Sequence, residues 1–183
     1  MKKSTQTTFT VESEEVLYTD QKTTCVDRQF LETLKTRAAA TKRKRIRLCV
    51  HADPDDNLHE MLIILHKDTY VPPHAHQNKS ESFHMIQGAL DIVLFNQDGT
   101  PKSAIPLSTD GSDYLYYRLS DATFHTVLPR SEWVIFHETT NGPFRREETI
   151  FADFAPDNSS SVDNQKSYLA KLRKFIGQHY GQL

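Results

Sequence analysis

Two histidines and a glutamate lie close together in the middle of the sequence, at a spacing that suits metal binding. His74 and His76 are separated by one residue, and Glu81 follows five positions later. Alternate residues of a β-strand point to the same face, so the two imidazoles project together, and a short connection brings Glu81 onto the adjacent strand. Two nitrogen ligands and one oxygen ligand suit a divalent transition metal such as Fe, Mn, Ni, Co or Zn. The segment therefore predicts a metal site.

The residues around this segment have the pattern of an all-β protein with flanking helices. Between about residues 48 and 155, short runs rich in β-branched and aromatic residues are separated by turn signals such as Asp98-Gly99. Eight antiparallel strands of this length favour a double-sheet jelly roll. The expected strands are residues 58–66, 69–76, 82–87, 90–96, 114–119, 123–128, 132–138 and 149–154.

Helical patterns flank the β region on both sides. Apolar residues recur at helical spacing within residues 26–40, and Asp27 is placed to cap that helix. A second amphipathic stripe follows Pro156 and is expected to end at Gly177. We therefore expect the chain to have three parts. Residues 1–47 form an N-terminal helical and extended segment packed on the barrel, residues 48–156 form the β-barrel with the metal site, and residues 157–183 form a C-terminal amphipathic helix.

Composition excludes several classes of protein. The 183 residues include 22 Lys and Arg against 24 Asp and Glu, for a formal charge of −2. This balance argues against a nucleic-acid or anionic-membrane partner, because both would favour a large basic surface. Residues 1–10 lack the apolar run of a signal peptide, and no later stretch is apolar enough to span a membrane, so we expect a cytoplasmic protein. Cys25 and Cys49 have no metal-type or redox-type spacing and are expected to be free thiols.

The metal segment resembles the first sequence motif of the cupin superfamily, G(x)5HxH(x)4E(x)6G. The matching residues are His74, His76, Glu81 and Gly88. Asp68 stands in place of the leading glycine. In cupins a histidine of a second motif, G(x)5PxGxxHxxxN, supplies a fourth ligand, and the resemblance implies His125 for that role. The Gly, Pro, Gly and Asn positions of that second motif are occupied here by Tyr114, Ser120, Ala122 and Pro129.

More narrowly, the chain is similar to the WbuC-type cupin-fold metalloproteins, which often accompany gene clusters for O-antigen and other surface polysaccharides. The similarity covers about residues 14–157 and is carried by residues 43–51, 58–63, 70–84, 116–118 and 136–144. It implies a cupin double-stranded β-helix (jelly roll) with one metal and a small-molecule ligand, for example a sugar or sugar nucleotide of lipopolysaccharide biosynthesis. The resembling fold also commonly forms a homodimer. The resemblance supplies no reaction.

Residues near the motif are candidates for contacts with a substrate. Lys79 lies in the loop between the His pair and Glu81, and either holds a substrate anion or is a solvated loop lysine. Tyr117 and Arg118 are candidates for the same task, because arginine holds carboxylates and phosphates bidentately. His137 either orients a ligand, contacts substrate or is structural. The basic run at residues 42–47 is either a phosphate-binding patch or a solvated sheet edge.

Three imidazoles and one carboxylate leave coordination positions open on a six-coordinate ion, which is typical of a working site rather than a structural one. One hypothesis is an enzyme that acts on a small polar metabolite, either isomerase-like or epimerase-like, or an Fe(II)-dependent dioxygenase. A second is a non-catalytic, metal-dependent binding or regulatory module. The sequence does not decide between them.

Overall fold

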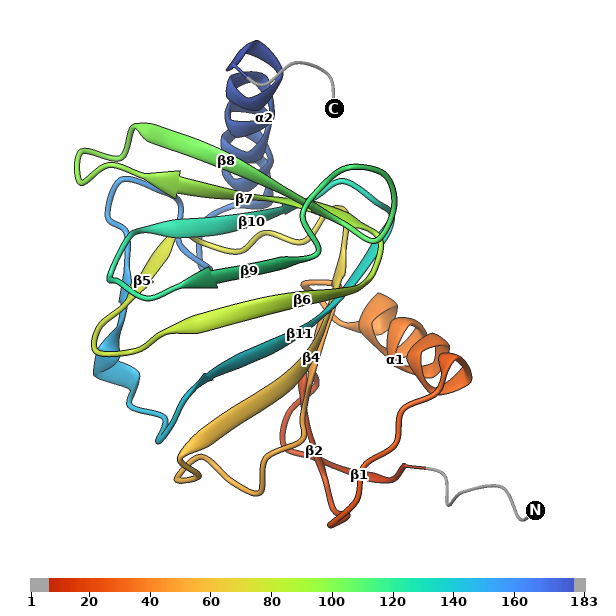
Figure 1. Ribbon diagram of the computed structural model, residues 1–183. Coiled ribbons are helices and arrows are strands. Elements are labelled where there is room, and N and C mark those ends of the chain that lie inside the picture. The colour runs from red at the N-terminus through yellow and green to blue at the C-terminus, as the bar shows by residue number, and fades with distance from the viewer. Residues whose placement is uncertain (1–6, 180–183) are drawn as a thin grey trace.

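The computed structural model describes residues 7–179, and two β-sheets packed against each other form its centre (Figure 1). The first six and last four residues, which belong to the expected N-terminal and C-terminal segments, lie outside the described part. The seven-stranded sheet has the order β1 (Phe9–Val11), β2 (Val16–Thr19), β3 (Arg45–Cys49), β4 (Leu58–His66), β11 (Trp133–Asn141), β6 (Glu81–Gln87) and β9 (Tyr116–Leu119). The five-stranded sheet has the order β12 (Thr149–Phe151), β5 (His74–His76), β10 (His125–Pro129), β7 (Ala89–Phe95) and β8 (Pro101–Ser108).

The expected jelly roll is confirmed by this strand order. The eight strands from β4 to β11 divide into two groups of four, β4-β11-β6-β9 in one sheet and β5-β10-β7-β8 in the other. Apolar side chains of both groups meet in one buried cluster that includes Phe83, Phe136, Ile92 and Leu107. β1, β2 and β3 extend the larger sheet beyond the jelly roll, with β2 and β3 pairing in parallel.

The strand predictions differ from the structure at prolines. β8 was not among the expected strands because Pro101 and Pro106 interrupt its pattern, but β8 is the edge strand of its sheet, where a missing backbone donor is tolerated. Conversely, the expected strand at 69–76 is reduced to β5, because Pro72 and Pro73 cannot donate to a ladder. The eighth strand of the jelly roll is thus β8, and β12 lies outside it.

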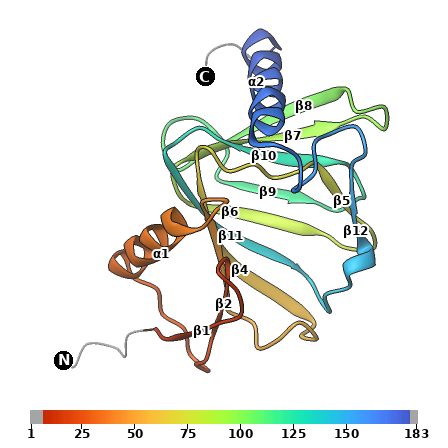
Figure 2. The same cartoon turned by 180° about the vertical axis from the view of Figure 1, so that it is seen from behind.

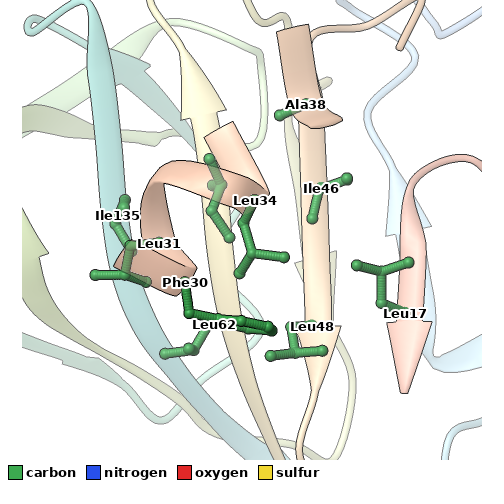
Figure 3. Close-up of a cluster of buried hydrophobic side chains, with 10 residues drawn as sticks. Leu17, Phe30, Leu31, Leu34, Ala38, Ile46, Leu48, Leu62 and Ile135 are labelled. Atoms are coloured by element: carbon green, nitrogen blue, oxygen red, sulfur yellow. The ribbon is translucent and has the colours of Figure 1, made fainter. Parts of the chain in front are cut away.

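Helix α1 (Arg28–Ala40) covers the outer face of the seven-stranded sheet (Figure 2). Its apolar side chains, among them Phe30 and Leu34, pack on Ile46, Leu48 and other side chains of β2, β3, β4 and β11 (Figure 3). As expected, Asp27 caps the helix, and its Oδ1 accepts a hydrogen bond of 2.8 Å from the backbone N–H of Phe30.

Helix α2 (Val162–His179) packs on the five-stranded sheet. Leu169, Leu172 and Ile176 are buried against side chains that include Val93 and Leu128. The helix continues past Gly177, so the stop expected there does not occur. Within residues 7–179, neither helix combines the length and hydrophobicity that crossing a membrane requires.

Candidate metal centre

Strands β5 and β10 bring three imidazoles together on the inner face of the five-stranded sheet. His74 and His125 are paired directly in the antiparallel register, and His76 follows two residues after His74 on the same face. Each side chain offers a ring nitrogen, and these nitrogens lie within 4.8 Å of one another. Ala75 points the opposite way and is buried. Such a group can hold one metal ion.

Hydrogen bonds fix the orientation of the three rings. Nδ1 of His74 donates to the carbonyl of Pro72 at 2.9 Å, and Nδ1 of His125 donates to the carbonyl of Thr123 at 3.0 Å. A carbonyl oxygen only accepts, so Nδ1 carries the proton in both rings, and Nε2 is the nitrogen available to a metal. Nδ1 of His76 lies 3.3 Å from Oγ1 of Thr149. Support of the second ring nitrogen in this manner is typical of metal-binding histidines.

Glu81 reaches the imidazoles from the facing sheet. It is the first residue of β6 and is only 3% exposed. Its Oε1 lies 2.7 Å from Nε2 of His125, and its Oε2 lies 3.5 Å from Nε2 of His76. Neither Oε1 of Glu81 nor Nε2 of His125 has a partner in hydrogen-bonding geometry among the described residues. Buried polar atoms left without a hydrogen bond are costly, and a cation between them would satisfy both. The donor set therefore fits a divalent transition metal.

Charge and burial set the protonation states of this cluster. Burial, helped by the neighbouring His125, lowers the pKa of His74 to about 3, so this imidazole is neutral as a metal ligand must be. Burial alone would raise the pKa of Glu81, but the charges and hydrogen bonds of His125, His76 and His74 together outweigh it and hold this pKa well below its usual range. The pKa of His125 is raised for the reciprocal reason, because Glu81 outweighs its burial. Without a metal, Glu81 and His125 therefore form a buried ion pair.

Gly88 shows why the motif requires a glycine after this strand. It connects β6 to β7 with φ +80°, a conformation that glycine adopts readily and other residues rarely do. A Cβ at this position would lie 2.5 Å from the carbonyl oxygen of Trp133. This tight connection joins β6, which carries Glu81, to β7 of the facing sheet.

A cavity of about 780 Å³ opens from this cluster. Its apolar walls include Met61, Phe83 and Phe136, and its far side is formed by β2 and β3. Ligand pockets for small molecules have volumes of about 300–1,000 Å³. The imidazole cluster thus lies in a space that can contain a metabolite-sized ligand.

Sequence reasoning missed Glu138, which lines the same cavity. It lies on β11, and it pairs with Met61 of β4 on one side and Phe83 of β6 on the other. Burial, reinforced by the charge of Glu81, raises the pKa of Glu138 to about 8, so its carboxyl holds a proton at neutral pH. The sequence could have indicated this position, because Glu138 and the apolar Phe136 are two residues apart in one strand and therefore lie on the same face.

Two of the substrate-contact candidates lie away from the cavity. His137 is on the outer face of β11, where its Nε2 lies 3.5 Å from Oε1 of Glu60. Arg118 is exposed and lies on the face of β9 opposite to that of Tyr117. His84 is also exposed, and it pairs with His137.

The other two candidates are close to the centre but differently engaged. Lys79 lines the cavity, yet its Nζ donates to the carbonyl of Pro143 at 2.7 Å and lies 3.1 Å from Oε2 of Glu148. Tyr117 is packed against Phe83, and its buried hydroxyl has no partner among the described residues. The ammonium group of Lys79 thus stabilises the cavity rim.

His51 and His59 also line the cavity. Their rings are stacked with centroids 4.0 Å apart and an angle of 8° between the planes. His59 is buried, while His51 also contacts the ring of Tyr18. The two stacked rings form an aromatic part of the wall of the cavity that also contains the imidazole cluster.

The strand order defines the fold as a double-stranded β-helix, or jelly roll, with an imidazole cluster between its two sheets. A family model described as a domain of unknown function (DUF6016) matches residues 26–107. No curated protein matches the sequence.

Several solved structures of this fold are similar at low sequence identity. CapF, a capsular polysaccharide assembling protein from Staphylococcus aureus, is 16% identical with a TM-score of 0.49, and the match covers 61% of this chain and 32% of CapF. KdgF from Halomonas sp. is 17% identical with a TM-score of 0.42, over 56% of this chain and 82% of KdgF. The cupin domain of Schizosaccharomyces pombe Cnp3 is 10% identical with a TM-score of 0.43, over 55% of this chain and 66% of that domain.

Proposed function

We propose that this protein is a WbuC-type metalloprotein that binds one divalent transition metal (Fe, Mn, Ni, Co or Zn) through three imidazoles and one carboxylate. The ligands would be His74, His76, Glu81 and His125. We further propose that it acts in the cytoplasm on a small polar metabolite, such as a sugar or sugar nucleotide of surface-polysaccharide metabolism. One observation carries the metal site, namely that three imidazoles with oriented rings lie beside a buried carboxylate at one end of a ligand-sized cavity.

A bound divalent metal would act as a Lewis acid toward a carbonyl or hydroxyl group of the ligand. The chain's own residues supply the remainder of the chemistry. Met61, Phe83 and Phe136 give the cavity apolar walls that can pack against the apolar parts of a ligand. Glu138 holds a proton at its carboxyl at neutral pH and faces the same space, so it is placed to give or take a proton at the ligand.

Glu138 favours an enzyme over a purely binding module. A binding site requires ligands and complementary walls, whereas a carboxyl group with a pKa near the working pH is what general acid–base catalysis requires. Isomerisation or epimerisation through proton transfer next to a carbonyl group would use both this carboxyl and the metal.

The test begins with the metal itself. The protein is purified without added metal, its metal content is measured by elemental analysis, and it is compared with the His74→Ala/His76→Ala double variant and with His84→Ala as a matched surface control. We expect the double variant to lose the metal and His84→Ala to keep it. Turnover of a panel of sugars and sugar nucleotides, with and without O₂, then separates an isomerase from a dioxygenase. Unchanged metal content in the double variant would refute the site, and ligand binding without metal-dependent turnover would favour the binding module.

A further inference from the structure

The far wall of the cavity carries arginines that belong to the basic run at residues 42–47. This run alternates in residue type, and the alternation coincides with the two faces of the chain. Arg43, Arg45 and Arg47 line the cavity, whereas Lys42 and Lys44 do not. The cavity is therefore lined by the residue type that recognises planar anions in a bidentate manner, although Arg43 and Arg47 are also exposed to solvent.

The strand register explains this sorting. In β3, Ile46 and Leu48 point toward α1 (Figure 3), so Arg45 and Arg47 point to the opposite face of the sheet. Arg47 pairs with Ile63 of β4, which also lines the cavity. Because β3 lies between β2 and β4, the basic run is not a sheet edge, and protection against edge aggregation does not account for it.

The arginines are only partly neutralised. Arg43 and Arg45 share the carboxylate of Glu15, with Nε of Arg43 at 2.7 Å from Oε1 and Nε of Arg45 at 3.0 Å from Oε2. Burial would raise the pKa of Glu15, but the hydrogen bonds from the two arginines outweigh it and leave this pKa lowered. The backbone N–H of Arg47 donates to the carbonyl of Glu15 at 2.9 Å, but its guanidinium makes no hydrogen bond or ion pair with any described residue, and its charge opposes the raised pKa of Glu138. The wall thus has three guanidinium groups for one buried carboxylate.

Two further carboxylates lie at the rim of this wall and reduce its field. Glu12 and Glu14 also line the cavity, but both are exposed to solvent, where interactions between charges are strongly screened. They do not engage Arg47 in an ion pair. A ligand in the cavity can therefore meet the guanidinium of Arg47, which has no ion-pair partner among the described residues and acts on Glu138 only through its charge.

The distance between the arginine wall and the imidazole cluster with Glu81 sets the length of a ligand that contacts both. β3 and β6 are three positions apart in the sheet, which separates their backbones by roughly 14 Å at about 4.8 Å per strand. Through Ile63 and Phe136, Arg47 is level with Met85 of β6, and Glu81 lies four residues further along that strand, so the backbone positions of Arg47 and Glu81 are roughly 19 Å apart. Both ends belong to one cavity. Because the side chains project into the cavity from both ends, the ligand that bridges them has the length of a small phosphorylated metabolite.

We propose that Arg47, supported by Arg45 and Arg43, forms a subsite for a phosphoryl group of the ligand whose reacting part lies at the metal cluster. Only the statement that the reacting part of the ligand lies at the metal site rests on the proposed function. The phosphoryl subsite does not, because the arginine wall does not depend on the metal. Bidentate pairing between guanidinium and phosphate explains why arginine rather than lysine occupies these positions.

The experiment measures binding of inorganic diphosphate to the full chain by isothermal titration calorimetry. The metal is first removed with a chelator and then by desalting, so that diphosphate cannot bind through the metal. The variants are Arg47→Gln, Arg47→Lys and, as a matched control, Arg118→Gln, whose arginine is exposed on the other face of its sheet. Malonate serves as a carboxylate probe of similar size. Circular dichroism and the metal content of each variant before chelation report on folding and on the metal site.

We expect Arg47→Gln to weaken diphosphate binding about tenfold or more, since hydrogen bonds to charged groups contribute most of such an affinity. Arg47→Lys is expected to recover part of it, and Arg118→Gln to bind as the wild type does. Equal affinity of Arg47→Gln and Arg118→Gln would overturn the subsite, as would the absence of wild-type binding at about 10 mM diphosphate. Malonate binding as tightly as diphosphate would overturn the phosphoryl assignment. Failure of the proposed metal site would be a separate result. It is tested by the metal content of the His74→Ala/His76→Ala variant and not by diphosphate binding to the metal-free protein.

Discussion

The two faces of the seven-stranded sheet carry opposite kinds of side chains on the same strands. On the outer face, Leu62 and Ile64 of β4 and Ile135 of β11 are buried under α1. On the inner face, Glu138 of β11 and Glu81 of β6 meet the cavity. Adjacent residues of one strand therefore have unrelated roles, and a shift of one residue in register would exchange them.

This contrast shows how a small domain separates stability from chemistry. The outer face contributes apolar burial, which is the main favourable term in folding. The inner face holds charged groups that would be costly in a dry core, but the cavity leaves some of them in contact with solvent and pairs others, such as Glu81 with His125. Variants on the two faces should therefore differ in what they change.

The largest expected effect separates two histidines that differ in the face they occupy. His125→Ala removes a proposed ligand, and we expect metal affinity to fall by more than the roughly 10–100-fold that loss of a supporting group costs. His137→Ala, on the outer face, should leave metal affinity unchanged. Competition with a chromophoric chelator measures both. Equal losses in the two variants would contradict the separation of the faces.

The second effect concerns stability on the outer face. Leu34 of α1 is fully buried in the cluster beneath the helix, and Leu34→Ala should lower the free energy of unfolding by about 3 kcal/mol. Urea denaturation measures this loss, and the exposed Thr36→Ala on the same helix is the control, with an expected change within about 0.5 kcal/mol. Metal stoichiometry of the folded Leu34→Ala protein should be unchanged. A loss of metal from that folded variant would show that the two faces are coupled.

The third effect is a pH dependence that arises on the inner face. The pKa of Glu138 is about 8 in the folded chain and near 4.5 when unfolded, so between these values the folded chain binds the extra proton. The stabilising contribution is complete below pH 4.5 and is lost as pH rises through 8. In metal-free protein, the free energy of unfolding of the wild type should fall by about 1–2 kcal/mol relative to that of Glu138→Gln as the pH rises from 4.5 to 8. This value is reduced to allow for screening by solvent in the cavity. Parallel stability curves for the two proteins from pH 5 to 9 would refute the assignment.

The smallest effect concerns Tyr117, whose hydroxyl is buried and has no partner among the described residues. Removing a buried, unpaired hydroxyl relieves its desolvation cost, so Tyr117→Phe should be neutral or stabilising by up to about 1 kcal/mol. Metal content should not change. A clear decrease in stability in thermal or urea unfolding would show that the hydroxyl of Tyr117 makes a stabilising interaction.

Much of the fold and part of the site follow from local patterns. The cap at Asp27 is a local interaction, and the alternation of His74 and His76 is a property of any strand. Strand β8 could not be predicted in this way, because its prolines are acceptable only at a sheet edge, and a strand's place in a sheet is not a local property. The same holds for Arg47, whose importance depends on which face of β3 is covered by α1.

The alternation along each strand and the spacing of His74, His76 and Glu81 can be read directly from the amino-acid order, because they depend only on the geometry of an extended chain. That His125 lies directly opposite His74, and that Glu138 and the arginines of β3 share one cavity with them, follows from the folded arrangement of the two sheets. His74 and His125 are 51 positions apart in the sequence, and Glu138 is 62 positions from His76. These contacts form because burial of apolar surface aligns whole strands and helices, and that alignment places the polar groups on the faces left open.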